Sequence, residues 1–110
     1  METAQAAKRF TVRVEPDDSV FMAYCEELDL VATGSTPPEA TRALLDVLWD
    51  YWLYLFNLSP EERAVPPLEE HFRLCQERLL PTMAEYGKEL LDASPQYLPE
   101  LLTKVFNFVL

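Results

Sequence analysis

The chain has 110 residues, 49% of them hydrophobic, and a formal net charge of −10 at pH 7. This length and hydrophobic content are typical of one folded domain with its own core, and they exclude a disordered chain. Nucleic acid phosphates repel such an acidic chain, so DNA binding is doubtful and a basic protein is the better matched partner. The alternative is that the charge only keeps the protein in solution.

The lack of a secretory signal pattern and the use of cysteine predict a cytoplasmic protein. The first ten residues, METAQAAKRF, contain no apolar core of a secretory signal. Around the aromatic segment the uncharged stretch covers residues 51–60, which is far short of the roughly 20 residues of a membrane span. Cys25 and Cys75 have no paired spacing and no companion histidine motif. We therefore predict two structural thiols and no membrane segment.

Three strands are predicted before the first glycine. Residues 10–14 (FTVRV) alternate apolar and polar side chains, which indicates a half-buried strand. After a turn at 15–19 (EPDDS), residues 20–25 (VFMAYC) are apolar throughout, as in a strand covered on both faces. Residues 30–33 (LVAT) form the third strand, so we predict an antiparallel meander.

A helix is predicted over residues 37–56. Gly34 ends the third strand, and Thr36 can cap the helix with its hydroxyl. Pro37 suits the first helical position, where the missing N–H costs nothing, and Glu39 completes a capping box. The start of this helix is therefore well marked in the sequence.

This predicted helix is apolar over most of its circumference, with a narrow polar stripe at Arg42, Asp46 and Asp50. A helix that packs on one sheet needs a narrower apolar face. We therefore expect a second neighbour, either the C-terminal helices or another copy in a homodimer or higher homo-oligomer. The residues predicted to form this packing or oligomer interface are Trp49, Tyr51, Trp52 and Phe56.

The C-terminal part reads as helical. Capping boxes are predicted at residues 59–62 and 82–85, with amphipathic helices over 68–80 and 82–92 that Pro81 separates. A further helix is predicted over 95–110, opened by Ser94 and Pro95. The alternative for the last six residues is a strand.

No pattern of catalytic residues stands out in the sequence. His71 is the one histidine, and Gly34 and Gly87 are the two glycines, so a phosphate-binding glycine loop cannot be built. No nucleophile with a base and no metal-ligand spacing is visible. We predict a protein that is not an enzyme and has no metal or cofactor. His71 is expected to be an ordinary helix residue.

Residues 21–48 resemble the HicB-like antitoxin family. The resemblance rests on a loop at Glu27-Leu28, a turn at 33–36 (TGST) and a helix start at Glu39-Ala40, and it covers residues 8–68. The loop differs from the family pattern, which has proline before the leucine and often glycine after it, where this chain has Glu27 and Asp29.

The resemblance implies an α+β fold, in which a small antiparallel meander with one long helix across it forms a truncated RNase H-like unit over residues 8–68. A helical extension over 69–110 would pack on the same core. The implied function is to bind and neutralise a small basic RNA-cleaving toxin of the HicA type. The nuclease chemistry of the ancestral fold needs a carboxylate on the first strand, and FTVRV has none.

Members of the family often repress their own operon through a C-terminal DNA-binding segment. Residues 57–110 contain five Lys and Arg against nine Asp and Glu, which does not suit phosphate contacts. The predicted partner-binding residues lie instead in the two acidic loops that flank the second strand, at Asp17, Asp18, Glu26, Glu27 and Asp29. The alternative function is a solitary adaptor with no toxin partner. The alternative for the loop carboxylates is that they are solvated and bind no partner.

Overall fold

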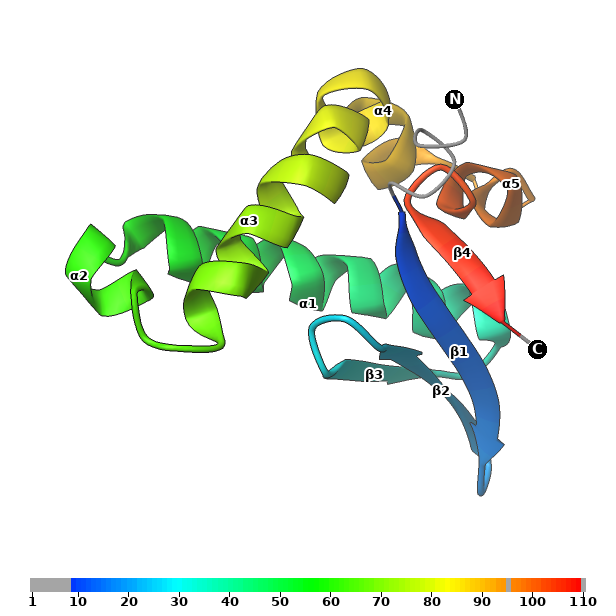
Figure 1. Cartoon of the computed structure of the whole chain (residues 1–110). Helices are drawn as coiled ribbons and strands as arrows, with labels where there is room; N and C mark the ends of the chain where they lie inside the picture. Colours follow the sequence, from blue (N-terminus) through cyan, green and yellow to red (C-terminus); the bar gives the residue numbers. More distant parts are fainter. Residues whose placement is uncertain (1–8, 95, 110) are drawn as a thin grey trace, which may run out of the picture.

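Strands and helices follow one another in the order expected for the first half of the chain. The computed structural model describes residues 9–94 and 96–109 (Figure 1). The elements are β1 (Phe10–Asp17), β2 (Val20–Cys25), β3 (Leu30–Gly34), α1 (Pro37–Asn57), α2 (Pro60–Arg63), α3 (Leu68–Arg78), α4 (Leu80–Asp92), α5 (Leu98–Leu102) and β4 (Phe106–Val109).

The four strands form one mixed sheet in the order β3-β2-β1-β4. β1 pairs antiparallel with β2, and β2 pairs antiparallel with β3, which confirms the predicted meander. β4 lies parallel to β1, with Phe106 opposite Phe10 and Phe108 opposite Val12. The fold is therefore α+β, as predicted.

The prediction of one helix over residues 95–110 is wrong for residues 106–109, which form a strand. α5 covers five residues, and residues 106–109 form β4, so the strand alternative is the correct one. Phe106 and Phe108 alternate with Asn107, and pairing with β1 satisfies the backbone of this segment while it buries Phe106. Pro95, at the predicted helix start, lies outside the described residues.

The first strand is longer than predicted. Residues 15–17 were expected in a turn but continue β1 to Asp17, and the turn is confined to Asp18 and Ser19. Asp18 has a φ of 58°, in the left-handed region that short polar side chains tolerate.

The start of α1 agrees with the sequence. Thr36 Oγ1 accepts the backbone N–H of Glu39 at 3.3 Å, while the Glu39 carboxylate accepts the N–H of Ser35 rather than that of Thr36. Gly34 lies against the first turn of the helix, because a Cβ added there would be 2.4 Å from the backbone nitrogen of Ala40. The absence of a side chain at Gly34 therefore lets the strand lead straight into the helix.

The later capping predictions had mixed outcomes. The box at residues 59–62 is formed in full and opens α2. The box at 82–85 is not formed, because α4 begins at Leu80 and takes Pro81 into its first turn. Thr82 instead directs its hydroxyl to the carbonyl of Lys104 at 3.4 Å.

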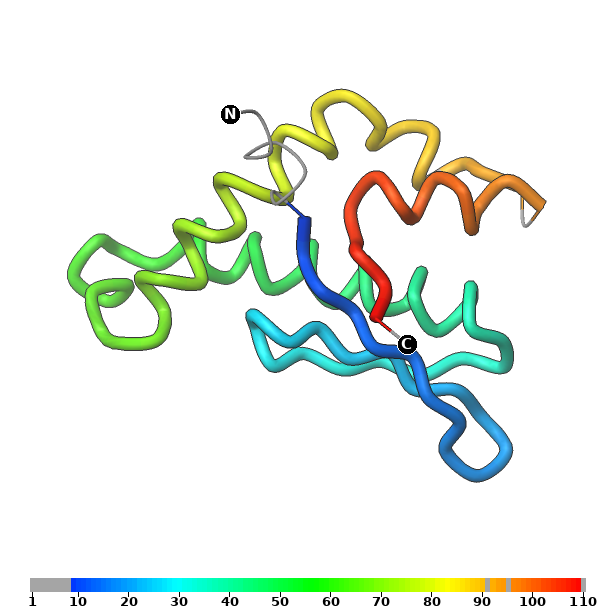
Figure 2. Tube along the Cα trace, turned by 45° about the vertical axis from the view of Figure 1, so that its right-hand side comes forward, coloured from blue at the N-terminus to red at the C-terminus, as the bar shows by residue number. Residues whose placement is uncertain are grey.

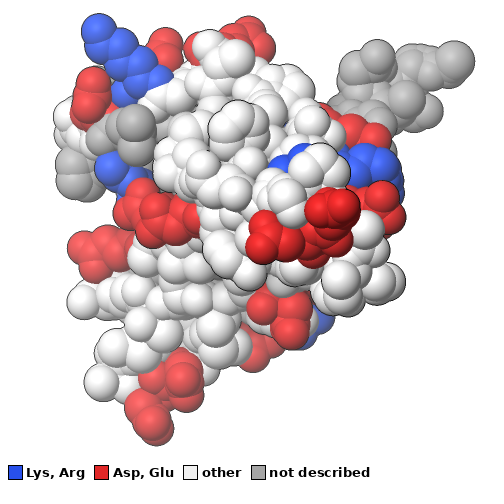
Figure 3. Space-filling view, turned by 90° about the vertical axis from the view of Figure 1, so that its left-hand side faces the viewer, with Lys and Arg blue, Asp and Glu red and all other residues white. Residues whose placement is uncertain are grey.

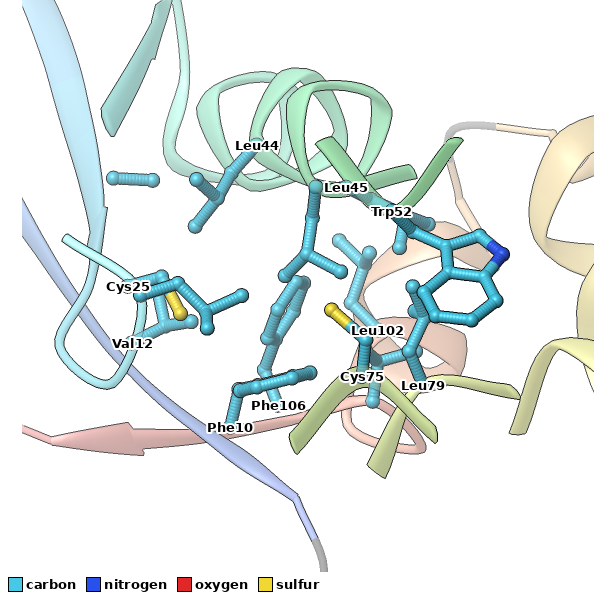
Figure 4. Packing of buried hydrophobic residues seen from close by; sticks show 14 of the residues in the cluster. Phe10, Val12, Cys25, Leu44, Leu45, Trp52, Cys75, Leu79, Leu102 and Phe106 are labelled. Carbon is cyan, nitrogen blue, oxygen red and sulfur yellow. The ribbon is translucent and has the colours of Figure 1, made fainter. Parts of the chain in front are cut away.

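α1 lies across one face of the sheet, and α3, α4 and α5 lead the chain back to place β4 beside β1 (Figures 1 and 2). The core between them is apolar and combines all parts of the fold (Figure 4). Its fully buried side chains come from α1 (Leu44, Leu45, Leu48 and Leu55), from the sheet (Phe10, Val12 and Phe106) and from the returning segment (Leu79, Leu90 and Leu102).

The opposite face of the sheet carries no described helix (Figure 1). On β2, Ala23 and Cys25 are fully buried on the helix side, whereas Val20, Met22 and Tyr24 keep partial exposure on the other side. The expectation that both faces of β2 are covered is therefore wrong for the described chain.

Candidate binding surfaces

The uncovered sheet face presents apolar side chains in register across the strands. Tyr24 lies between Arg13 on β1 and Val31 on β3, and Val109 of β4 continues this row beyond Arg13. In the next row Met22 lies between Glu15 and Thr33. We call this surface the open face, with Val20, Met22, Tyr24, Val31 and Val109 as its apolar side chains.

Two of these apolar side chains are well exposed. Val31 is 51% exposed and Val109 is 39% exposed. A sheet face in contact with water normally carries polar residues. The outer side of β2 is unusual because all three of its residues, Val20, Met22 and Tyr24, are apolar. Sequence reasoning missed this surface because it interpreted the run VFMAYC as one buried strand. The period of two along the strand was the signal that could have divided it into two faces.

The five predicted acidic residues do not form one cluster. Asp17 and Asp18 lie at the β1–β2 hairpin, while Glu26, Glu27 and Asp29 lie between β2 and β3, at the other end of β2 (Figure 1). The six residues of β2 separate the two loops by roughly 17 Å at the usual rise per residue. The two loops therefore stand at opposite ends of the open face, and the partner-binding role of their residues stays a prediction.

Glu27 has a structural position. Its carboxylate accepts the backbone N–H of Thr11 at 2.8 Å and the Thr11 hydroxyl at 2.8 Å, and Arg78 Nη1 donates to it at 3.2 Å. The side chains of Glu27 and Arg78 are 21% and 23% exposed. This carboxylate joins β1, the β2–β3 loop and α3, so it is not free to receive a partner.

The other two acids of this loop also have partners within the chain. Glu26 pairs with Arg13, whose guanidinium lies 5.8 Å from the centre of the Tyr24 ring. Asp29 accepts a hydrogen bond from the Tyr24 hydroxyl at 2.8 Å, and this bond is the main reason that the pKa of Tyr24 is raised. Both residues are exposed, so their carboxylates lie at the rim of the open face.

The aromatic half of α1 is partly covered by the chain itself. Trp52 is 6% exposed and stacks on Phe72 of α3, with ring centroids 5.1 Å apart. The Arg63 guanidinium lies 4.0 Å from the centre of the Phe72 ring and donates to the carbonyls of Leu55 and Leu58 at 3.1 and 2.7 Å. Trp52, which was predicted as packing or interface, therefore packs inside the described chain.

Tyr51 and Trp49 are half-buried against the same core. The Tyr51 hydroxyl lies 2.7 Å from Nδ1 of His71, which gives the single histidine a contact between α1 and α3. Burial raises the pKa of Tyr51, and burial lowers the pKa of His71.

The outer side of this end of α1 remains exposed. Phe56 is 59% exposed, Tyr54 is 54% exposed and Leu53 is 41% exposed. Figure 3 views the molecule from the end that carries α2, and acidic groups there surround uncharged surface. Of the four predicted interface residues, Phe56 is thus the one that is mostly exposed.

Both cysteines are buried free thiols. Burial raises the pKa of each thiol to about 12, so both stay protonated at neutral pH. Within residues 9–94 and 96–109, no three His, Cys, Asp or Glu side chains come together in a group that could hold a metal ion. No helix in that part of the chain is long and apolar enough to cross a membrane.

No protein-family model, curated protein or solved structure matches this chain.

Proposed function

We propose that this chain is a HicB-like antitoxin, a binding protein that neutralises a small basic RNA-cleaving toxin of the HicA type and catalyses no reaction itself. The truncated RNase H-like fold of that family is part of the proposal. It is supported by the α+β architecture, in which one long helix crosses a small sheet whose first three strands form a meander.

The observation that carries the proposal is the open face. Its apolar side chains on β2 and β3 lie beside Arg13 and Glu15 of β1. Carboxylates border them at both ends of β2, with Asp17 and Asp18 at one end and Glu26 and Asp29 at the other. Such a surface fits a protein that brings apolar side chains with lysines and arginines around them. The carboxylates would speed the encounter, and the apolar side chains would supply most of the affinity.

The chemistry of the potentially reactive groups supports a binding role. Glu27 is held by Thr11 and Arg78, and both thiols are buried and protonated. His71 is engaged with Tyr51 between two helices. The Cys25 thiol also lies 3.9 Å from the Glu27 carboxylate, so each of these groups is buried or bonded within the fold.

The test is to isolate the tagged chain from its native cell, identify any small basic protein that co-purifies, and measure RNA cleavage by that protein. We expect cleavage by the isolated partner and its suppression when the chain is added in equal amount. If the partner does not cleave RNA, or if cleavage continues at full rate with the chain bound, the antitoxin function is wrong. If no basic protein co-purifies, the solitary adaptor replaces it.

Two exposed substitutions locate the surface. Val31→Lys places a cation on the β3 side of the open face, beside Tyr24, and should weaken binding of the basic partner about tenfold or more. Tyr54→Lys adds the same charge on the exposed side of α1 and should leave binding within about twofold. Equal effects of the two variants would exclude the open face as the binding surface.

A further inference from the structure

The edge of the sheet formed by β4 has an unusual composition. β4 has no described strand on its outer side, and its sequence, FNFV, contains no charge and no proline. Soluble proteins normally protect an edge strand with charged side chains or proline, because unpaired backbone groups recruit other strands. Phe108 and Val109 are each 39% exposed here.

The backbone groups available at this edge follow from the register. The N–H of Phe10 donates to the carbonyl of Val105 at 3.1 Å, and Phe10 is opposite Phe106. In a parallel pair, alternate residues direct their backbone groups toward the neighbouring strand. The backbone N–H and C=O groups of Val105 and Asn107 therefore point toward β1. Those of Phe106 and Phe108 point away from it, toward the outer side of β4.

An apolar pocket of about 340 Å³ adjoins the end of this strand. It lies where β4 and β1 meet the first turn of α1 and the end of α5. Every lining residue is uncharged: Val14, Pro37, Pro38, Thr41, Pro99, Leu102, Thr103, Phe108 and Val109. The pocket and the edge together form one uncharged surface, which we call the β4 edge.

Charge decides what can bind to the β4 edge. Two copies of a chain with a net charge of −10 repel each other, and the repulsion is weakest where the facing surfaces carry no charge. A basic protein gains no ion pairs from the lining residues of this pocket. The β4 edge is therefore better suited to a second copy than to the proposed basic partner.

We propose that two copies of this chain associate through their β4 edges. The strands run antiparallel across a twofold axis, and the two sheets join into one sheet of eight strands. Antiparallel pairing of identical strands satisfies twofold symmetry, because each strand gives and receives the same contacts. The apolar side chains at the end of each strand pack against the pocket of the other copy. Val109 belongs to both surfaces, but this proposal does not rest on the antitoxin function.

The proposal also changes the expected interface. A homo-oligomer was predicted from the apolar circumference of α1, but α3 covers Trp52 and part of Tyr51 within the chain. The β4 edge offers outward backbone groups that pair with no other described strand, which the exposed residues of α1 cannot offer. Tyr54 is the residue that distinguishes the two interfaces experimentally.

Sedimentation equilibrium of the full chain over a hundredfold range of micromolar concentration provides the first measurement. We expect a reversible monomer–dimer equilibrium for the wild type. Phe108→Lys puts a charge on the edge, and Thr103→Arg fills the mouth of the pocket from an exposed position outside the core. Each should raise the dissociation constant of the dimer about tenfold or more, with helix content unchanged by circular dichroism.

Val31→Lys at the other edge strand and Tyr54→Lys on α1 are the matched controls, and both should dimerise like the wild type. A wild type that stays monomeric throughout the concentration range overturns the proposal. So does a monomeric Tyr54→Lys variant, which would place the interface on α1. If Phe108→Lys alters the circular dichroism spectrum, Thr103→Arg decides the question.

Cross-linking tests the geometry separately. Because both native thiols are buried and protonated, a cysteine introduced at the surface is the one that reacts. Asn107→Cys, on β4, should give a covalent dimer with a short bis-maleimide at least about tenfold faster than Thr33→Cys, on β3. Equal rates for the two variants would contradict pairing through β4.

Discussion

The carboxylate of Glu27 accepts the backbone N–H and the side-chain hydroxyl of Thr11, each at 2.8 Å. The backbone groups of Thr11 point from β1 toward the start of the β2–β3 loop. The Thr11 carbonyl accepts the backbone N–H of Glu26 there at 3.0 Å. A residue predicted to meet a partner thus holds its own first strand in place. Charge reversal at Glu27 would therefore damage the fold before it reported on any partner.

We predict that Glu27→Gln lowers the free energy of unfolding by about 1–3 kcal/mol, because the neutral amide replaces a charged acceptor for Thr11 and Arg78. Urea denaturation measures the change. Glu26→Gln is the matched control, since its ion pair with Arg13 is exposed, and it should cost less than about 1 kcal/mol. Equal losses in the two variants would contradict a special role for Glu27.

Gly34→Ala should be strongly destabilising. Its Cβ would lie 2.4 Å from the backbone nitrogen of Ala40, and backbone on both sides must shift, at a cost of about 1–3 kcal/mol. Gly87→Ala in α4 is the opposite case, because its Cβ would be 3.5 Å from the flexible end of Met83. That variant should gain about 0.5–1 kcal/mol from helix propensity. Thermal unfolding of both variants compares the signs directly.

Arg63→Ala should lower the free energy of unfolding, because Arg63 connects the C-terminal end of α1 to α3. The guanidinium donates to carbonyls at the C-terminus of α1 and lies over Phe72, so its removal should cost about 1–2 kcal/mol. Arg73→Ala removes exposed ion pairs to Glu70 and Glu77 and should cost less than about 1 kcal/mol. Chemical denaturation that ranks Arg73 above Arg63 would show that the capping contacts contribute little.

Cys25 and Cys75 should resist alkylation in the folded protein at about pH 8, because burial keeps both thiols protonated with pKa values of about 12. Both should react rapidly in denaturant. A folded pKa above the ordinary value means that the thiols stabilise the fold below pH 9 and that this stability is lost as the pH rises toward 12. Mass spectrometry after iodoacetamide treatment counts the modified thiols; rapid modification of the folded chain would be the contrary result.

His71 should make the fold more sensitive to acid. Burial lowers its pKa in the folded state, so its contribution is complete above the ordinary value of 6.5 and is lost as the pH falls through the folded pKa. His71→Gln should therefore show a smaller drop in melting temperature between neutral pH and mildly acidic pH than the wild type. An identical drop in both proteins would mean that His71 does not contribute to the acid sensitivity.

The meander and the start of α1 could be predicted because their signals are local. Alternation in FTVRV, the turn at Asp18 and the cap at Thr36 lie within a few residues of the structures that they determine. The identity of β4 could not be predicted in this way. The segment from Val105 onward fits a helix or a strand by its own pattern, and the free edge of β1 at the other end of the sequence decides between them.

The position of the acidic residues at the two ends of the second strand could be predicted, but the partners of their side chains could not. Glu27 and Asp29 are two residues apart in one loop, yet Glu27 turns toward Thr11 and Arg78 while Asp29 meets the Tyr24 hydroxyl. The direction of each side chain depends on partners from other elements, and the left-handed φ of 56° at Asp29 has no clear local signal. The burial of Trp52 likewise depends on another element, because its ring stacks on Phe72 of α3.

The parallel pairing of β4 with β1 has a consequence for synthesis on the ribosome. β1 is the first described element to leave the ribosome, but its strand partner on one side is the last. Until then Phe10 and Val12 lack the neighbour that buries them, and a free strand edge faces the crowded cell. Closure between distant segments also carries a large entropic cost and slows folding. The nascent chain is therefore most vulnerable to aggregation just before β4 emerges, when the other strands and the helices are made but the sheet is incomplete.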